Sequence, residues 1–171
     1  MKRAPNRLPW LGGLFFALAL TGAADARDAE KLAVAGWVEE GWLGEPPMKV
    51  KVKLDTGART SSIHAAQFRD YEKDGKRRVS FTLTNNDGVE RTIDAEVVRI
   101  ASIRRAGAEL QQRPVIRLKL CIAGVTRETE FTMADRSELT YPVLAGRSFL
   151  AGRFLVDPDR TYRAAGTCAA R

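Results

Sequence analysis

Histidine and cysteine are scarce in this sequence. Among 171 residues there are one histidine and two cysteines, too few and too scattered for zinc-ligand spacing. No Gly-x-x-x-x-Gly-Lys-Ser/Thr phosphate loop and no His-Glu-x-x-His pair occurs. Basic residues outnumber acidic ones by 28 to 21, but no run of them is long enough to predict a nucleic-acid surface. We therefore expect no metal, no cofactor and no nucleic-acid partner.

The first 26 residues have the three-part layout of a secretory signal peptide. Basic residues begin it, an uncharged stretch over 8–24 follows, and Ala24-Asp25-Ala26 has small residues where a signal peptidase requires them. A retained membrane anchor is the alternative, but the apolar stretch is short for a bilayer and contains glycines. The sequence predicts cleavage after Ala26, export to the periplasm or medium of a Gram-negative bacterium, and no stable membrane insertion afterwards.

Export changes how the two cysteines are interpreted, because an oxidising compartment permits disulfides. Alternation along 117–122 places Cys121 on the polar face, with Arg117 and Lys119, where its thiol is available for pairing. Cys168 lies in the C-terminal tail. Two interpretations remain open: a Cys121–Cys168 disulfide that ties the tail to a sheet, and two unpaired thiols.

Alternation of apolar and polar residues dominates after residue 33, and helical periodicity is nearly absent. The clearest case is 48–54, which places four apolar residues on one face and three lysines on the other. Strands are also expected over 33–39, 60–64, 78–83, 91–100, 114–122, 126–133, 139–144 and 154–156, with a turn over 41–47 and one short helix within 146–152. The sequence predicts one mainly β domain over 27–171, built of antiparallel sheets folded into a small barrel.

The strand over 48–54 runs directly into Asp55-Thr56-Gly57-Ala58. The strand would fix Asp55 at the rim of the barrel, and Thr56 could stiffen the turn by local hydrogen bonds. Gly57 would let backbone and substrate approach the carboxylate closely. For Asp-Thr-Gly alone, an ordinary Asx-turn between strands is the simpler interpretation.

Four segments together resemble one protein family. They are residues 53–65 (Lys-Leu-Asp-Thr-Gly-Ala-Arg-Thr-Ser-Ser-Ile-His-Ala), 113–116 (Arg-Pro-Val-Ile), 141–147 (Tyr-Pro-Val-Leu-Ala-Gly-Arg) and 156–158 (Val-Asp-Pro). The combination is similar to the bacterial retropepsin-like aspartic proteases, which are often labelled ATP-dependent zinc proteases. The resemblance covers residues 33–163. The label of ATP-dependent zinc protease has no support in this sequence, which contains neither an ATP-binding nor a zinc-binding motif.

The resemblance implies a small closed β-barrel with one short C-terminal helix and an aspartic endopeptidase activity. Asp55 would be the catalytic aspartate, braced by Thr56 and Gly57. Aspartic proteases need two carboxylates that share one proton, and no other aspartate of the mature chain precedes Thr-Gly or Ser-Gly. A symmetric homodimer that supplies two copies of Asp55 follows from this requirement.

Substrate contacts are expected at Ala58 and at a covering hairpin over 100–113. Arg104 and Arg105 lie in this hairpin, with Gly107 at its tip and Arg113 at its end. If these arginines face the cleft, they favour acidic peptides. A simple solvated hairpin is the alternative.

Gly146 and Arg147 are expected to have structural roles. In viral retropepsins this arginine pairs with an acidic residue after Asp-Thr-Gly-Ala, but Arg59 stands at that position here. The resemblance therefore implies a different partner for Arg147.

Two other functions compete with the protease. His64 lies near Ser61 and Ser62, as in a serine hydrolase, but adjacency in a strand is not triad geometry, and a structural or surface histidine is favoured. The second is a non-catalytic binding or scaffold module of the periplasm, which would keep the barrel and never dimerise.

Overall fold

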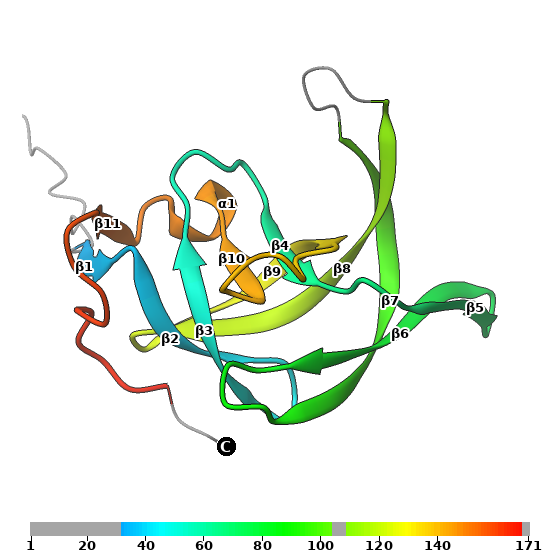
Figure 1. Cartoon of the computed structure of the whole chain (residues 1–171), viewed down its shortest axis with the longest axis horizontal. Helices are drawn as coiled ribbons and strands as arrows, with labels where there is room; N and C mark the ends of the chain where they lie inside the picture. The colour runs from blue at the N-terminus through cyan, green and yellow to red at the C-terminus, as the bar shows by residue number, and fades with distance from the viewer. Residues whose placement is uncertain (1–31, 104–108, 169–171) are drawn as a thin grey trace, which may run out of the picture.

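The computed structural model describes residues 32–103 and 109–168, which form a barrel with a long curved extension (Figure 1). One four-residue helix accompanies the strands. In chain order the elements are β1 (Ala33–Gly36), β2 (Val38–Leu43), β3 (Met48–Leu54), β4 (Ser61–His64), β5 (Arg69–Lys73), β6 (Lys76–Thr84), β7 (Glu90–Ile103), β8 (Gln111–Ile122), β9 (Val125–Ala134), β10 (Val143–Ala145), α1 (Arg147–Leu150) and β11 (Phe154–Asp157).

Six strands close the barrel in the order β2-β3-β10-β4-β9-β8, because β2 also pairs with β8. At this closure Gly41 lies opposite Ile122, and a Cβ atom on Gly41 would be 2.9 Å from the Val52 side chain. Strands β7, β6 and β5 continue from β8 in the same sheet. Val79, Phe81 and Leu83 of β6 join the core cluster of the barrel, whereas β5 projects away from it (Figure 1). The expected mainly β barrel with one short helix is confirmed.

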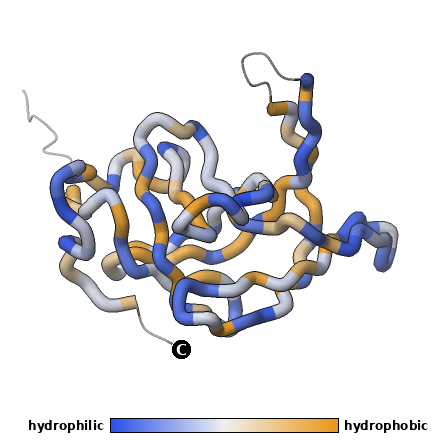
Figure 2. The backbone as a smooth tube through the Cα atoms, in the orientation of Figure 1, coloured by the Kyte–Doolittle hydropathy of each residue, from blue (hydrophilic) through white to orange (hydrophobic). Residues whose placement is uncertain are grey.

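The core follows from the period-two pattern of the strands. In β3 the residues Met48, Val50, Val52 and Leu54 are buried while the lysines between them are partly or fully exposed. The alternation of hydrophobic and hydrophilic residues along the tube is visible in Figure 2. Phe131 from β9 joins the same apolar cluster. Burial of this one-sided surface is the main force that holds the barrel together.

The expected strand over 33–39 is two strands in the structure. The chain changes partners at Trp37, whose backbone N–H donates to Arg160 O at 2.9 Å, so β1 pairs with β11 and β2 with β3. The expected turn over 41–47 starts at Gly44, because Gly41 to Leu43 pair with β8. β5 was not expected, since its residues are largely exposed and charged and show no apolar alternation.

The expectation of purely antiparallel sheets is wrong for three strand pairs. β1 with β11, β3 with β10, and β4 with β9 are parallel. β10 lies between β3 and β4 although it follows both by many residues, so the C-terminal half of the chain inserts into the N-terminal half. Such long-range pairing cannot be read from local alternation.

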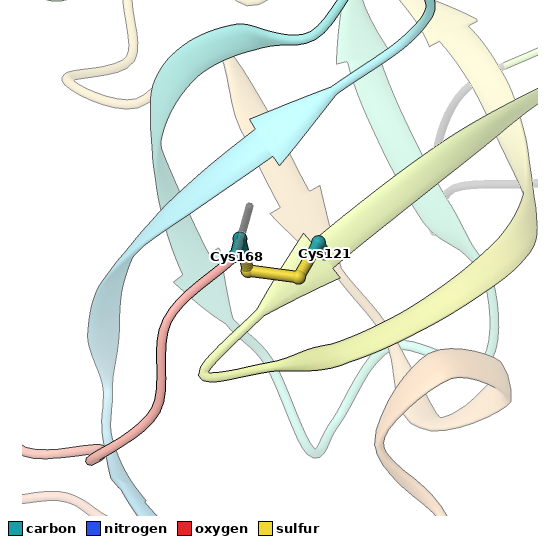
Figure 3. The surroundings of a disulfide bond; sticks show 2 residues. All are labelled: Cys121 and Cys168. Carbon is teal, nitrogen blue, oxygen red and sulfur yellow. A yellow bond between two sulfur atoms is a disulfide. The ribbon is translucent and has the colours of Figure 1, made fainter. Parts of the chain in front are cut away.

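A C-terminal strap, residues 158–168, forms backbone hydrogen bonds with Trp37 and Val38 and is fastened at two further points. Glu39 is buried, and its Oε1 atom accepts the backbone N–H groups of Arg163 and Ala164 at 2.9 Å each. The second point is a disulfide between Cys121 of β8 and Cys168, with Cα atoms 5.9 Å apart (Figure 3). The strap therefore ties the end of the described chain to the barrel wall.

Among the described residues, no helix is long and apolar enough to cross a bilayer. The predicted signal peptide over 1–26 lies outside the described residues.

Candidate active site

Asp55 begins the turn that follows β3. Its backbone N–H donates to Ala145 O at 2.9 Å, which continues the β3–β10 ladder by one residue. Its Oδ1 atom accepts the N–H groups of Gly57 at 2.9 Å and Ala58 at 3.1 Å. Asp55 is half-buried, whereas Thr56 and Gly57 are exposed. The carboxylate is thus oriented by backbone donors at an open face of the molecule.

Gly146 and Arg147 hold this turn from the other side. The Gly146 N–H donates to the buried Ser61 hydroxyl at 3.1 Å, and the Arg147 N–H donates to Ala58 O at 2.9 Å. A Cβ atom on Gly146 would lie 2.5 Å from the Thr60 carbonyl oxygen, so a side chain here would push the two segments apart.

The Arg147 side chain binds backbone carbonyl groups in place of an acidic side chain. Its Nη1 atom donates to the carbonyl oxygens of Thr56 at 2.9 Å and Gly57 at 2.8 Å. A guanidinium that binds two carbonyls fixes the turn without an acidic residue at position 59. Among the described residues, the Thr56 hydroxyl makes no hydrogen bond. The turn is stiffened instead by the bonds of the Asp55 carboxylate and the Arg147 guanidinium.

The ends of β7 and β8 pair with each other where the covering hairpin was expected. Ser102 lies opposite Gln112, and Ile103 opposite Gln111. These strand ends extend well beyond the barrel (Figure 1). Arg104, Arg105 and Gly107 lie outside the described residues, and the Arg113 side chain donates to Gln111 Oε1 at 2.9 Å.

His64 has bonds that suit a structural role. Its Nδ1 atom accepts the backbone N–H of Arg136 at 3.0 Å, and the backbone N–H of His64 donates to Pro142 O at 2.8 Å. The two neighbouring hydroxyls are occupied elsewhere, Ser61 by Gly146 and Ser62 by Arg136. Within the described residues, no three His, Cys, Asp or Glu side chains gather as a metal site requires.

Arg136 was not predicted from the sequence. It is 8% exposed, and its side chain donates to Ser62 Oγ at 3.0 Å and Tyr141 O at 3.1 Å. Burial lowers the pKa of Arg136, and the charge of Asp55 opposes that effect. In the sequence, Asp135-Arg136-Ser137 is typical of a solvated turn, so no pattern pointed to it.

A closed barrel with an Asp-Thr-Gly turn braced by a Gly-Arg pair defines a retropepsin-like fold. The chain belongs to the RimB-like family, described as retropepsin-like aspartic endopeptidase RimB, whose model matches residues 34–166. A crystal structure of a Legionella pneumophila protein of unknown function is similar, with a TM-score of 0.67 and 28% identity; the match covers 78% of this chain and 98% of that one.

The curated relatives are named as ligases and not as peptidases. A probable alpha-L-glutamate ligase of Shewanella halifaxensis is 33% identical over 129 residues, which are 72% of this chain and 28% of that protein. One from Parasynechococcus marenigrum is 32% identical over 130 residues, 74% of this chain and again 28% of the relative. The chain therefore spans little more than a quarter of the length of these relatives.

Proposed function

We propose that this chain is an aspartic endopeptidase whose active site forms between two copies in a homodimer. The observation that carries the proposal is the Asp55 turn, in which backbone N–H groups hold Oδ1 while Thr56 and Gly57 remain exposed. An exposed half-site beside a fixed carboxylate is what a two-fold partner would complete. One half-site alone lacks the second carboxyl group that the reaction requires.

In the proposed reaction the two Asp55 side chains share one proton. The ionised carboxylate takes a proton from a water molecule, whose oxygen attacks the carbonyl carbon of the peptide bond. The protonated partner donates its proton to the carbonyl oxygen, which gives a tetrahedral intermediate. The C–N bond then breaks as the carboxyl group that took the water proton gives it to the nitrogen. A hydroxyl proton of the intermediate passes to the other carboxylate, which restores the shared proton, and the two products are a carboxylic acid and an amine.

The first test is cleavage of a diverse peptide mixture by residues 27–171, beside the Asp55→Asn variant, from acidic to neutral pH. We expect the wild-type chain to cleave and the variant to lose activity by at least about a thousandfold, since a dyad member is removed. Its unfolding temperature should stay near that of the wild type. Equal cleavage by both proteins would contradict the role of Asp55.

The relatives supply a reason to include acidic peptides in the mixture. They are named as glutamate ligases, and the chain matches only a quarter of their length, so ligation itself is not proposed for it. A peptidase related to part of such proteins would meet glutamate-containing chains as substrates. Preferential cleavage beside glutamate would support this substrate class, and indifference to glutamate would exclude it.

We also propose that the protein works outside the cytoplasm, as the N-terminal segment predicts. The Cys121–Cys168 disulfide supports this location, because disulfides persist in oxidising compartments. Fractionation of the native host with an antibody against the chain tests it.

The alternative is a binding or scaffold module on the same barrel. Sedimentation at rising concentration separates the two: a two-fold dimer supports the peptidase, and a stable monomer without cleavage supports the module.

A further inference from the structure

Arg136 is an unusual residue for its surroundings. Among the described lysines and arginines it alone is buried, with 8% of its surface exposed. Burial of a charged group is unfavourable unless hydrogen bonds and an opposite charge compensate. The contacts of its guanidinium are neutral, namely Ser62 Oγ and Tyr141 O, and the carboxylate that acts on its charge is Asp55.

Arg136 connects β4 with the segment that leads into β10. Its backbone N–H binds His64 at the end of β4, and its Nη1 binds Ser62 in the same strand. Its Nε binds Tyr141 O, in the segment that leads into β10. β10 in turn lies between β3 and β4 and provides the carbonyl that binds the Asp55 N–H.

From these contacts we propose that Arg136 is a positioning residue of the active site. It locks the 137–142 loop onto β4, so that β10 holds Asp55 in place. This inference rests on the proposed function, since it assigns Arg136 a role in that reaction. The arginine acts through the loop and through its charge and does not touch the reacting atoms.

The test compares Arg136→Met, which removes the charge and both donors, with Arg136→Lys, which keeps the charge. Arg117→Met is the matched control, because Arg117 is an arginine on the outer surface of β8, paired with Glu130. We expect kcat of Arg136→Met to fall at least about tenfold with KM little changed, because misplacement of a catalytic group slows the chemical step. Arg136→Lys should recover part of kcat, and Arg117→Met should match the wild type.

Hydrogen exchange of the same proteins provides a readout that does not need activity. In Arg136→Met we expect faster exchange of the His64 N–H, which binds Pro142 O, and of the Asp55 N–H, while the β6–β7 ladder exchanges as in the wild type. If kcat per folded molecule is unchanged, or if exchange rises equally throughout the chain, Arg136 is a stability residue and the inference is wrong.

Failure of the proposed function and failure of the further inference would give different results. If the wild-type chain cleaves nothing, the proposed function fails, and the catalytic role of Arg136 fails with it. The exchange pattern then still shows whether Arg136 locks the loop onto β4. If the wild type cleaves and Arg136→Met cleaves equally well, the inference alone fails.

Discussion

At the scale of single residues, the orientation of Asp55 comes from backbone groups. Two N–H donors fix its Oδ1 atom, and Arg147 holds the carbonyls of the same turn. Gly146 permits this arrangement because the chain passes too close to Thr60 for any side chain. The geometry of the carboxylate therefore depends on how closely two backbone segments approach.

Gly146→Ala is expected to destabilise the protein by about 2–3 kcal/mol, because the new methyl group meets backbone atoms that cannot rotate away. Urea unfolding measures the change. Gly57→Ala is the comparison, since its Cβ atom would lie 3.2 Å from Asp55 Oδ1, a milder contact than the 2.5 Å approach to the Thr60 carbonyl oxygen at Gly146. We expect Gly57→Ala to retain more stability than Gly146→Ala, and the reverse order would contradict the steric argument.

At the scale of strands, an ion-pair cluster links three neighbours of the sheet. Glu130 of β9 accepts hydrogen bonds from Arg99 of β7 at 2.8 Å and Arg117 of β8 at 3.3 Å. The pKa of Glu130 is lowered, first by Arg99, although partial burial acts in the opposite direction. The cluster crosses the junction between the closed barrel and its curved extension.

The lowered pKa of Glu130 determines how the stability of the folded chain changes with pH. The unfolded chain binds a proton at Glu130 near the ordinary value of 4.5, and the folded chain does so at lower pH, so acid favours unfolding. The contribution of Glu130 is full above about pH 4.5 and is lost as the pH falls through the folded pKa. We expect Glu130→Gln to narrow the gap in unfolding temperature between pH 7 and pH 3. Glu128→Gln, on the same strand and exposed, should leave that gap unchanged.

The strands that alternate clearly were predictable, and those shaped by distant partners were not. β3 follows from its own sequence, because each of its apolar residues faces the core. β5 has no apolar face, and β10 needs β3 and β4 on either side to be recognised as a strand. Asp55 was found because the motif is local, whereas Arg136 depends on the fold that buries it.

At the scale of the whole molecule, the C-terminal strap fastens the end of the described chain to the barrel. Glu39 accepts its backbone N–H groups, and the disulfide closes a covalent loop between β8 and Cys168 (Figure 3). β9, β10, α1 and β11 lie entirely within that loop. The strap therefore restricts the half of the chain that carries Gly146 and Arg147.

Removal of the disulfide in a Cys121→Ala/Cys168→Ala double variant is expected to lower stability by up to about 4 kcal/mol, from the loop entropy of a 47-residue separation. Urea unfolding with and without a dithiol reductant measures this loss. The wild type should lose stability on reduction to the level of the variant, and the variant should not respond. A wild type indifferent to full reduction would contradict the prediction.

The parallel pairing of β1 with β11 brings residues 33–36 beside residues 154–157. The first and last strands of the barrel segment therefore form a two-stranded sheet of their own, before the chain continues from β11 into the strap (Figure 1). Because β1 and β11 pair with each other, neither strand can leave the surface without the loss of the other's hydrogen bonds. The two ends of the barrel segment thus protect each other from fraying, the usual fate of chain ends.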